Sequence, residues 1–218
     1  GGGAAAGPCL AAARSKVGGR VTVEGRSIAK LFDSEQRATH GLAWLATYVE
    51  ALRQLASYAE RLATQGRLGE IEELIVRIGV GEYLAQIAGG ISMSQGEIVR
   101  LGDLGLSTSE VAHRWTPALD GLNASGHTTL NRARPADLIR MQRSMIVGDS
   151  GLDEALEQVR EEMRGFADHE VVPHAQNWHR TNSYVPYEVI AQLSELGVFS
   201  LTIPEEFGGL GLGKEAMC

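Results

Sequence analysis

The chain has 218 residues, of which 44% are hydrophobic and 6% aromatic, and its formal net charge is −7. This length and hydrophobic content support one or two globular domains and argue against a disordered protein. Abundant alanine, leucine and glutamate favour an all-α fold over a β-sandwich or barrel. No basic patch is interleaved with aromatic residues, so neither nucleic acid nor an anionic membrane surface is expected as a partner.

The N-terminal segment GGGAAAGPCLAAARSKVGG is dominated by glycine and alanine and shows no hydrophobic period. We therefore expect residues 1–20 to form a flexible leader. Cys9 and Cys218 lie at opposite ends of the chain, which gives no disulfide framework or metal-ligand spacing and favours a reducing cytoplasm. No apolar run approaches the ~20 residues of a membrane span, and none has the form of a signal peptide.

Residues 33–64 predict one long amphipathic helix, because apolar side chains recur at spacings of three and four. These are Leu42, Leu45, Val49, Leu52, Leu55, Ala59 and Leu62. Gly66 is expected to end this helix. The following GEIEELIVRIGVGEYLAQIAG predicts a second helix with a candidate break around Gly79 and Gly81. The short connection predicts that the two helices pair antiparallel.

Two serine–glutamate pairs have the spacing of a helix capping box, in which the side chains satisfy the free amides of a first turn. They are Ser94 with Glu97 and Ser107 with Glu110, and each predicts a helix start. Residues 119–134 are polar and aperiodic and predict a linker, followed by a short helix over Pro135–Met145. We therefore assign residues 21–134 to a helical extension and residues 135–218 to a second domain.

From Gly151 onward the chain is acidic, with 12 acidic and 4 basic residues. A helical apolar period starts here and runs to Pro173, which is expected to end or bend it. It is formed by Leu152, Leu156, Val159, Met163 and Phe166. Pro186 suits the first turn of a further helix, which Gly197 stops. A short extended segment, an acidic turn, a glycine-rich loop and the start of a third helix follow.

The glycine-rich loop, Gly208 to Glu215, reads GGLGLGKE and nearly matches the phosphate-binding pattern G-x-x-x-x-G-K-[ST]. That pattern needs a hydroxyl group after the lysine to hold magnesium, and Glu215 would instead repel phosphate. Glu205 and Glu206 make the approach more negative. We therefore predict that the glycines serve backbone geometry.

Two other patterns give no active site. The tetrapeptide GDSG at residues 148–151 matches the surroundings of the nucleophile in trypsin-like serine proteases, but a helical chain lacks their double barrel, and Ser150 is predicted to be a helix N-cap.

His169, His174 and His179 are spaced by five, which rotates successive rings by about 140° on a helix, so no shared metal-binding face is expected. The residues alone predict two helical units without catalytic groups.

The second unit nevertheless resembles a known family, the flavin-dependent acyl-CoA dehydrogenases, in their N-terminal helical domain. The resemblance rests on a helix ending in V-P-x-A, a proline-opened helix ending in L-G-V, and the run IPEEFGGLGL, and it covers about a quarter of the chain. His179 departs from the family, which often has an acidic residue at this position. The resemblance implies that the glycine run is a structural turn.

The resemblance also implies where the chemistry lies. In this family FAD and acyl-CoA are held mainly by a middle β-domain and a C-terminal helical domain, which would lie beyond Cys218 together with the catalytic glutamate. No catalytic, cofactor-binding or metal-binding residue is therefore assigned within the 218 residues. The implied reaction removes an α-proton with the glutamate, transfers the β-hydride to flavin N5, and passes electrons to electron-transferring flavoprotein.

The preceding region, including HGLAWLATYVEALRQL and GEYLAQIAGGISMSQGE, resembles the N-terminal extension of the methylsuccinyl-CoA dehydrogenase branch. That branch oxidises (2S)-methylsuccinyl-CoA to mesaconyl-CoA in the ethylmalonyl-CoA pathway. We expect the chain to be the N-terminal part of a longer, cytoplasmic, homo-oligomeric enzyme, whose extension docks through the stripe Trp44, Leu45, Tyr48 and Leu52. The alternative is a helical interaction module without catalytic activity.

Overall fold

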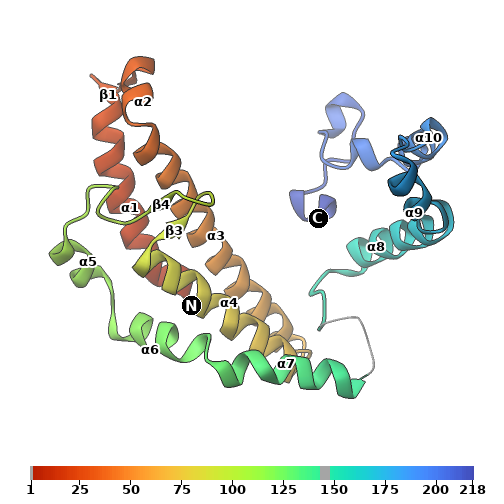
Figure 1. Cartoon of the computed structure of the whole chain (residues 1–218), viewed down its shortest axis with the longest axis horizontal. Coiled ribbons are helices and arrows are strands. Elements are labelled where there is room, and N and C mark those ends of the chain that lie inside the picture. Colours follow the sequence, from red (N-terminus) through yellow and green to blue (C-terminus); the bar gives the residue numbers. More distant parts are fainter. Residues whose placement is uncertain (1, 143–147) are drawn as a thin grey trace. The chain divides into compact units, whose positions relative to one another are not determined.

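The structure is a computed structural model that describes residues 2–142 and 148–218, and it is mostly helical, as the composition predicts (Figure 1). It divides into two compact units, Gly1–Gly151 and Leu152–Cys218. The sequence pattern places the domain boundary earlier, between residues 134 and 135. That point lies inside α7 (Thr129–Gln142), which packs against α4 (Glu70–Gly89) and so belongs to the first unit.

The core of the first unit is built on α3 (Gln36–Thr64), against which α1 (Gly2–Val21) and α4 both pack (Figure 1). Leu45 and Leu52 are fully buried and Tyr48 is 8% exposed, while Trp44 is half-buried against the same core. The expectation that this stripe docks on another part of the enzyme is therefore corrected: helices of the same unit already cover most of it.

The flexible leader predicted for residues 1–20 is wrong, because these residues belong to α1. Ala6, Cys9, Ala13 and Val17 recur at spacings of three and four, and each is at most 1% exposed. Their small side chains let α1 lie close along α3, so burial stabilises a segment whose glycine content alone disfavours a helix. The stripe was missed because alanine and cysteine carry little hydrophobic contrast.

The long predicted helix starts slightly later than expected. The shorter α2 (Ala29–Ser34) precedes it, and Glu35 separates α2 from α3. Between α1 and α2 the strands β1 (Thr22–Val23) and β2 (Arg26–Ser27) form an antiparallel hairpin. Gly66 follows the end of α3 with φ +68°, in the left-handed region, which confirms it as the stop of this helix.

Helix α4 follows and runs antiparallel to α3, as predicted (Figure 1). The candidate break around Gly79 and Gly81 is absent from this helix, which is continuous. Gly81 instead faces Gly126 of α6 (Pro117–Gly126), where an added Cβ would lie 2.8 Å from the Gly126 Cα. The glycine therefore permits close helix packing and does not interrupt the helix.

The two capping-box predictions have different outcomes. Ser94 and Glu97 bond to each other through their backbones in the turn of a hairpin, β3 (Ile91–Ser92) with β4 (Ile98–Val99), so the helix predicted there is wrong. Ser107 does cap α5 (Thr108–Arg114): its hydroxyl accepts from the Glu110 amide, and its own amide donates to the Glu110 carboxylate at 2.8 Å.

The linker predicted for residues 119–134 is also wrong. Helix α6 starts at Pro117 behind the Thr116 cap, and α7 follows after a two-residue connection. The glycines of α6 and the polar composition of α7 hid these helices, but both pack on α4. The predicted helix Pro135–Met145 lies within α7 up to Gln142, and residues 143–145 lie outside the described residues.

The second unit contains α8 (Glu154–Phe166), a π-helical turn (Ala167–Val171), α9 (Val172–Thr181) and α10 (Tyr187–Glu195). Pro173 does not end the helical path; it occupies the first turn of α9. Pro186 is the N-cap of α10, and Gly197, with φ +80°, follows its end as predicted.

Within the described ranges, none of the helices is long and apolar enough to cross a membrane.

Candidate functional site

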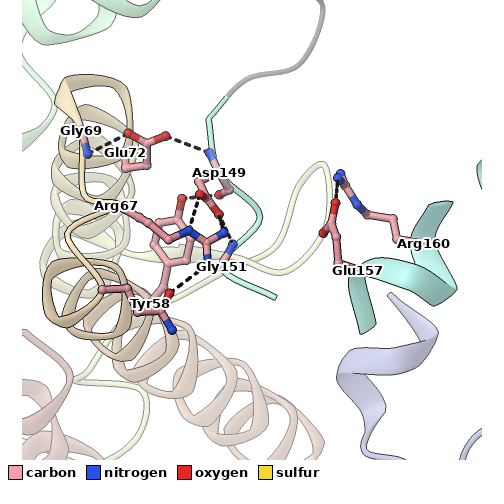
Figure 2. Close-up of polar contacts among 9 residues, drawn as sticks. Tyr58, Arg67, Gly69, Glu72, Asp149, Gly151, Glu157 and Arg160 are labelled. Atoms are coloured by element: carbon pink, nitrogen blue, oxygen red, sulfur yellow. Dashed lines mark hydrogen bonds and ion pairs between the residues drawn. The ribbon is translucent and has the colours of Figure 1, made fainter. Parts of the chain in front are cut away.

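A cluster of polar contacts surrounds Asp149, at the end of the first unit (Figure 2). Arg67 holds its carboxylate with two bonds, from Nε to Oδ2 at 2.8 Å and from Nη2 to Oδ1 at 2.5 Å. The Tyr58 hydroxyl donates to its carbonyl oxygen at 2.6 Å, and its amide donates to Glu72 Oε1 at 2.8 Å. We call these four residues and Gly151 the Asp149 cluster.

Glycines shape the backbone of this cluster. Gly148 and Gly151 have φ of +80° and +69°, which L side chains rarely adopt. A Cβ added at Gly151 would lie 2.8 Å from the ring of Tyr58, and the Gly151 amide donates to Asp149 Oδ1 at 2.8 Å. The two glycines of the GDSG tetrapeptide therefore serve a tight turn against α3.

Of the charged side chains in the cluster, only Glu72 is buried, whereas those of Arg67 and Asp149 are 41% and 25% exposed. Glu72 is 6% exposed, and its two carboxylate oxygens accept from the amides of Gly69, at 3.0 Å, and Asp149. Burial first, and then the negative charges of Glu72 and Asp149, raise the pKa of Tyr58, so the phenol stays a protonated donor at neutral pH. Buried charge persists when it is paired and hydrogen-bonded in this way. The arrangement is suited to holding a backbone in place, and it presents no activated base.

Ser150 does not have its predicted role as a helix N-cap. The N-cap of α8 is Asp153, whose Oδ1 accepts from the Leu156 amide at 2.9 Å, so the prediction of Ser150 as cap is wrong. The described chain is helical with two short hairpins, and it contains no barrel of the serine-protease type. No local pattern could have revealed the Asp149 cluster, since Arg67 and Asp149 are 82 residues apart.

The glycine-rich loop uses its amides internally. Leu210 and Leu212 donate to the carbonyl oxygens of Ser200 and Leu201, at 2.9 and 2.8 Å, and Gly211 donates to Ile203 at 2.8 Å. These amides are therefore not available to form a phosphate cradle.

Position 209 has no room for a side chain. A Cβ added at Gly209 would lie 2.1 Å from the Ile203 carbonyl oxygen. Gly208 and Gly211 have φ of +82° and +61°. The loop thus folds back on the preceding turn through backbone bonds, which is the geometric role predicted for its glycines.

The three histidines lie in separate environments. His169 is in the π-helical turn, and its Nδ1 lies 2.7 Å from the Gly165 carbonyl oxygen. His174 packs on Trp178, with ring centroids 5.8 Å apart, and His179 is in the last turn of α9. Across the part of the chain that the structure describes, no group of three or more His, Cys, Asp or Glu residues could hold a metal ion.

Each unit has a hollow that is a candidate binding site. A groove of about 490 Å³ in the first unit is lined mainly by apolar side chains of α3 and α4, with Glu60, Glu73 and Arg77 beside them. A smaller hollow of about 250 Å³ in the second unit lies between the first turns of α8 and residues 212–216. Neither is lined by both a candidate base and a cluster of phosphate-binding donors.

Residues 153–218 match the family described as acyl-CoA dehydrogenase, N-terminal domain. Over 206 residues, 94% of its length, the chain is 50% identical to a (2S)-methylsuccinyl-CoA dehydrogenase from Cereibacter sphaeroides. The similarity therefore extends through the helical extension, as the resemblance in the sequence predicts.

Two other relatives match a shorter part of the chain. Over 66 residues it is 36% identical to a glutaryl-CoA dehydrogenase from Desulfococcus multivorans, and over 68 residues it is 38% identical to a mitochondrial isovaleryl-CoA dehydrogenase from Solanum tuberosum. Each match covers 30% of this chain and 17% or 16% of the relative. The chain spans 37% of the length of the Cereibacter relative.

Proposed function

We propose that this chain is the N-terminal part of an FAD-dependent acyl-CoA dehydrogenase that oxidises (2S)-methylsuccinyl-CoA to mesaconyl-CoA. The observation that carries the proposal is the 50% identity over 206 residues, which includes the extension and not only the family domain. The relatives that share about 66 residues act, by their names, on glutaryl-CoA and isovaleryl-CoA. The extension is thus the feature that favours the methylsuccinyl-CoA substrate.

Two observations bear on where a flavin or coenzyme A would bind. The amides of residues 208–212 donate to carbonyl oxygens of residues 200–205, and neither of the two hollows described above gathers groups for a dinucleotide. We therefore propose that FAD, the acyl-CoA substrate and the catalytic glutamate are held by residues outside this chain. No step of the reaction is assigned to the 218 residues.

The surface of the second unit supports its place in a larger body. Large apolar side chains are exposed on it, including Tyr184 at 96%, Tyr187 at 78% and Phe207 at 74%. Large apolar side chains exposed close together are typical of a surface that packs against another domain or subunit. Further dehydrogenase domains would cover it in the proposed enzyme. Homo-oligomerisation, a cytoplasmic location and electron transfer to electron-transferring flavoprotein belong to the same proposal.

The test uses the full-length polypeptide that contains this chain. It should purify with bound flavin, and (2S)-methylsuccinyl-CoA should bleach the flavin absorbance faster than glutaryl-CoA or isovaleryl-CoA at equal concentration. Faster bleaching by either of the other two esters would overturn the substrate assignment. A full-length protein without flavin would overturn the enzyme assignment and favour the helical interaction module.

A further inference from the structure

We propose that the Asp149 cluster is an anchor that fixes the point at which the chain leaves the first unit, and so restricts how freely the two units reorient. This inference concerns the connection between the units and does not depend on the reaction proposed above. It rests on the bonds that converge on one short segment, residues 148–151 (Figure 2).

The position of the anchor in the chain gives it this effect. Residues 143–153 connect the end of α7 at Gln142 to the start of α8 at Glu154. Asp149 is bonded to α3, α4 and the turn between them, and the Gly151 amide is bonded to Asp149, so only residues 150–153 separate Asp149 from α8. This connection is shorter than the whole of residues 143–153, so a bonded Asp149 limits the rotations that the longer connection would permit.

The bonds of the anchor restrain both the side chain and the backbone of Asp149. Its carboxylate receives a two-pronged guanidinium contact, which fixes orientation as well as position. Its backbone is held on both sides, since its amide donates to Glu72 and its carbonyl accepts from Tyr58. Helix packing elsewhere in the unit needs none of these bonds, because the core of α1, α3 and α4 lies on other residues.

The first measurement is backbone amide exchange in the 218-residue chain. The amides of Asp149 and Gly151 both donate inside the cluster, and they should be protected. Asp149→Asn and Arg67→Ala should each speed their exchange at least tenfold, and Arg67→Lys should have an intermediate effect because a lysine cannot make the two-pronged contact. The matched control is Asp137→Asn, which removes an exposed ion pair with Arg140 in α7.

The second measurement tests the restriction itself. Relaxation of ¹⁵N in α3 and α8 gives a rotational correlation time for each unit. In Asp149→Asn the correlation times of the two units should differ more than they do in the unchanged chain. The proposal is overturned if exchange at Asp149 and Gly151 stays the same in Asp149→Asn with the helical content intact. It is equally overturned if exchange rises but the tumbling of the units does not change, or if Asp137→Asn has the same effects.

Discussion

Gly41 packs against the β3–β4 hairpin, and we expect Gly41→Ala to destabilise the first unit. A Cβ added at this position would lie 2.4 Å from Cγ2 of Val99 and 3.1 Å from its Cβ. Val99 is 1% exposed and pairs with Ile91 across the hairpin, so it cannot retreat without opening the strands. A β-branched side chain also has little freedom to change its rotamer.

The expected loss is the difference between two opposing effects. Alanine favours a helix over glycine by about 1 kcal/mol, whereas inserting a carbon into a packed core costs about 1–3 kcal/mol. Two atoms of Val99 lie at or below 3.1 Å from the added carbon, which places this site at the upper end of that cost. The net loss in the free energy of unfolding should be about 1–2 kcal/mol.

Urea unfolding followed by tryptophan fluorescence measures this loss. Replacing Trp178 by Phe leaves Trp44 and Trp115, both in the first unit, as the reporters. Gly121→Ala is the matched control: Gly121 lies inside α6 with nothing within 4 Å of an added Cβ, so this change should be neutral or stabilise by up to about 1 kcal/mol. Adding Val99→Ala should relieve the effect of Gly41→Ala. A Gly41→Ala chain as stable as the unchanged one would refute the reasoning.

Four further changes test the capping, the core and the glycine-rich loop. Ser107→Ala removes the cap of α5 and should cost about 1 kcal/mol in urea unfolding. The Ser107 amide first, and then Lys16, lower the pKa of Glu110 to about 2 from its ordinary 4.5, so Glu110 stabilises the fold above about pH 4.5 and loses this effect as the pH falls toward 2. Glu110→Gln should therefore flatten the acid side of the stability curve, and an unchanged curve would contradict this cause. Changing Leu45 and Leu52 together to Asp should cost several kcal/mol and abolish cooperative unfolding of the first unit, since both are fully buried. In the full-length protein, Lys214→Ala should leave CoA-ester affinity nearly unchanged, and a large loss with the fold intact would mean that the lysine meets a phosphate.

The parts of the fold that the sequence predicts correctly are those with strong local signals. The stripe of leucines and valines along α3 has high hydrophobic contrast, and Gly66 supplies a left-handed stop at its end. Ser107 and Glu110 carry both halves of a capping box. In each case a few neighbouring residues determine the structure, because the interaction that fixes it lies within one or two helical turns.

Where the prediction fails, the deciding partner is distant in the sequence. The small residues of α1 become a buried stripe only against α3, and Gly81 is compatible with a continuous helix because Gly126 packs against it. Ser94 and Glu97 have the same spacing as the correct cap, but they lie in a hairpin turn whose strands pack on α3. Helix propensity and local motifs are weak when tertiary contacts favour another structure.

The Asp149 cluster is the clearest example of this limit in a candidate site. Read locally, GDSG offers either a nucleophile or a helix cap, and both readings concern Ser150. In the structure it is Asp149 that is fixed, by Tyr58, Arg67 and Glu72, whose positions in the sequence give no sign of a common partner. The glycines on either side have their left-handed φ angles because the segment must turn onto α3. A tetrapeptide can therefore be decisive for the connection between two units while its resemblance to a catalytic motif has no chemical consequence.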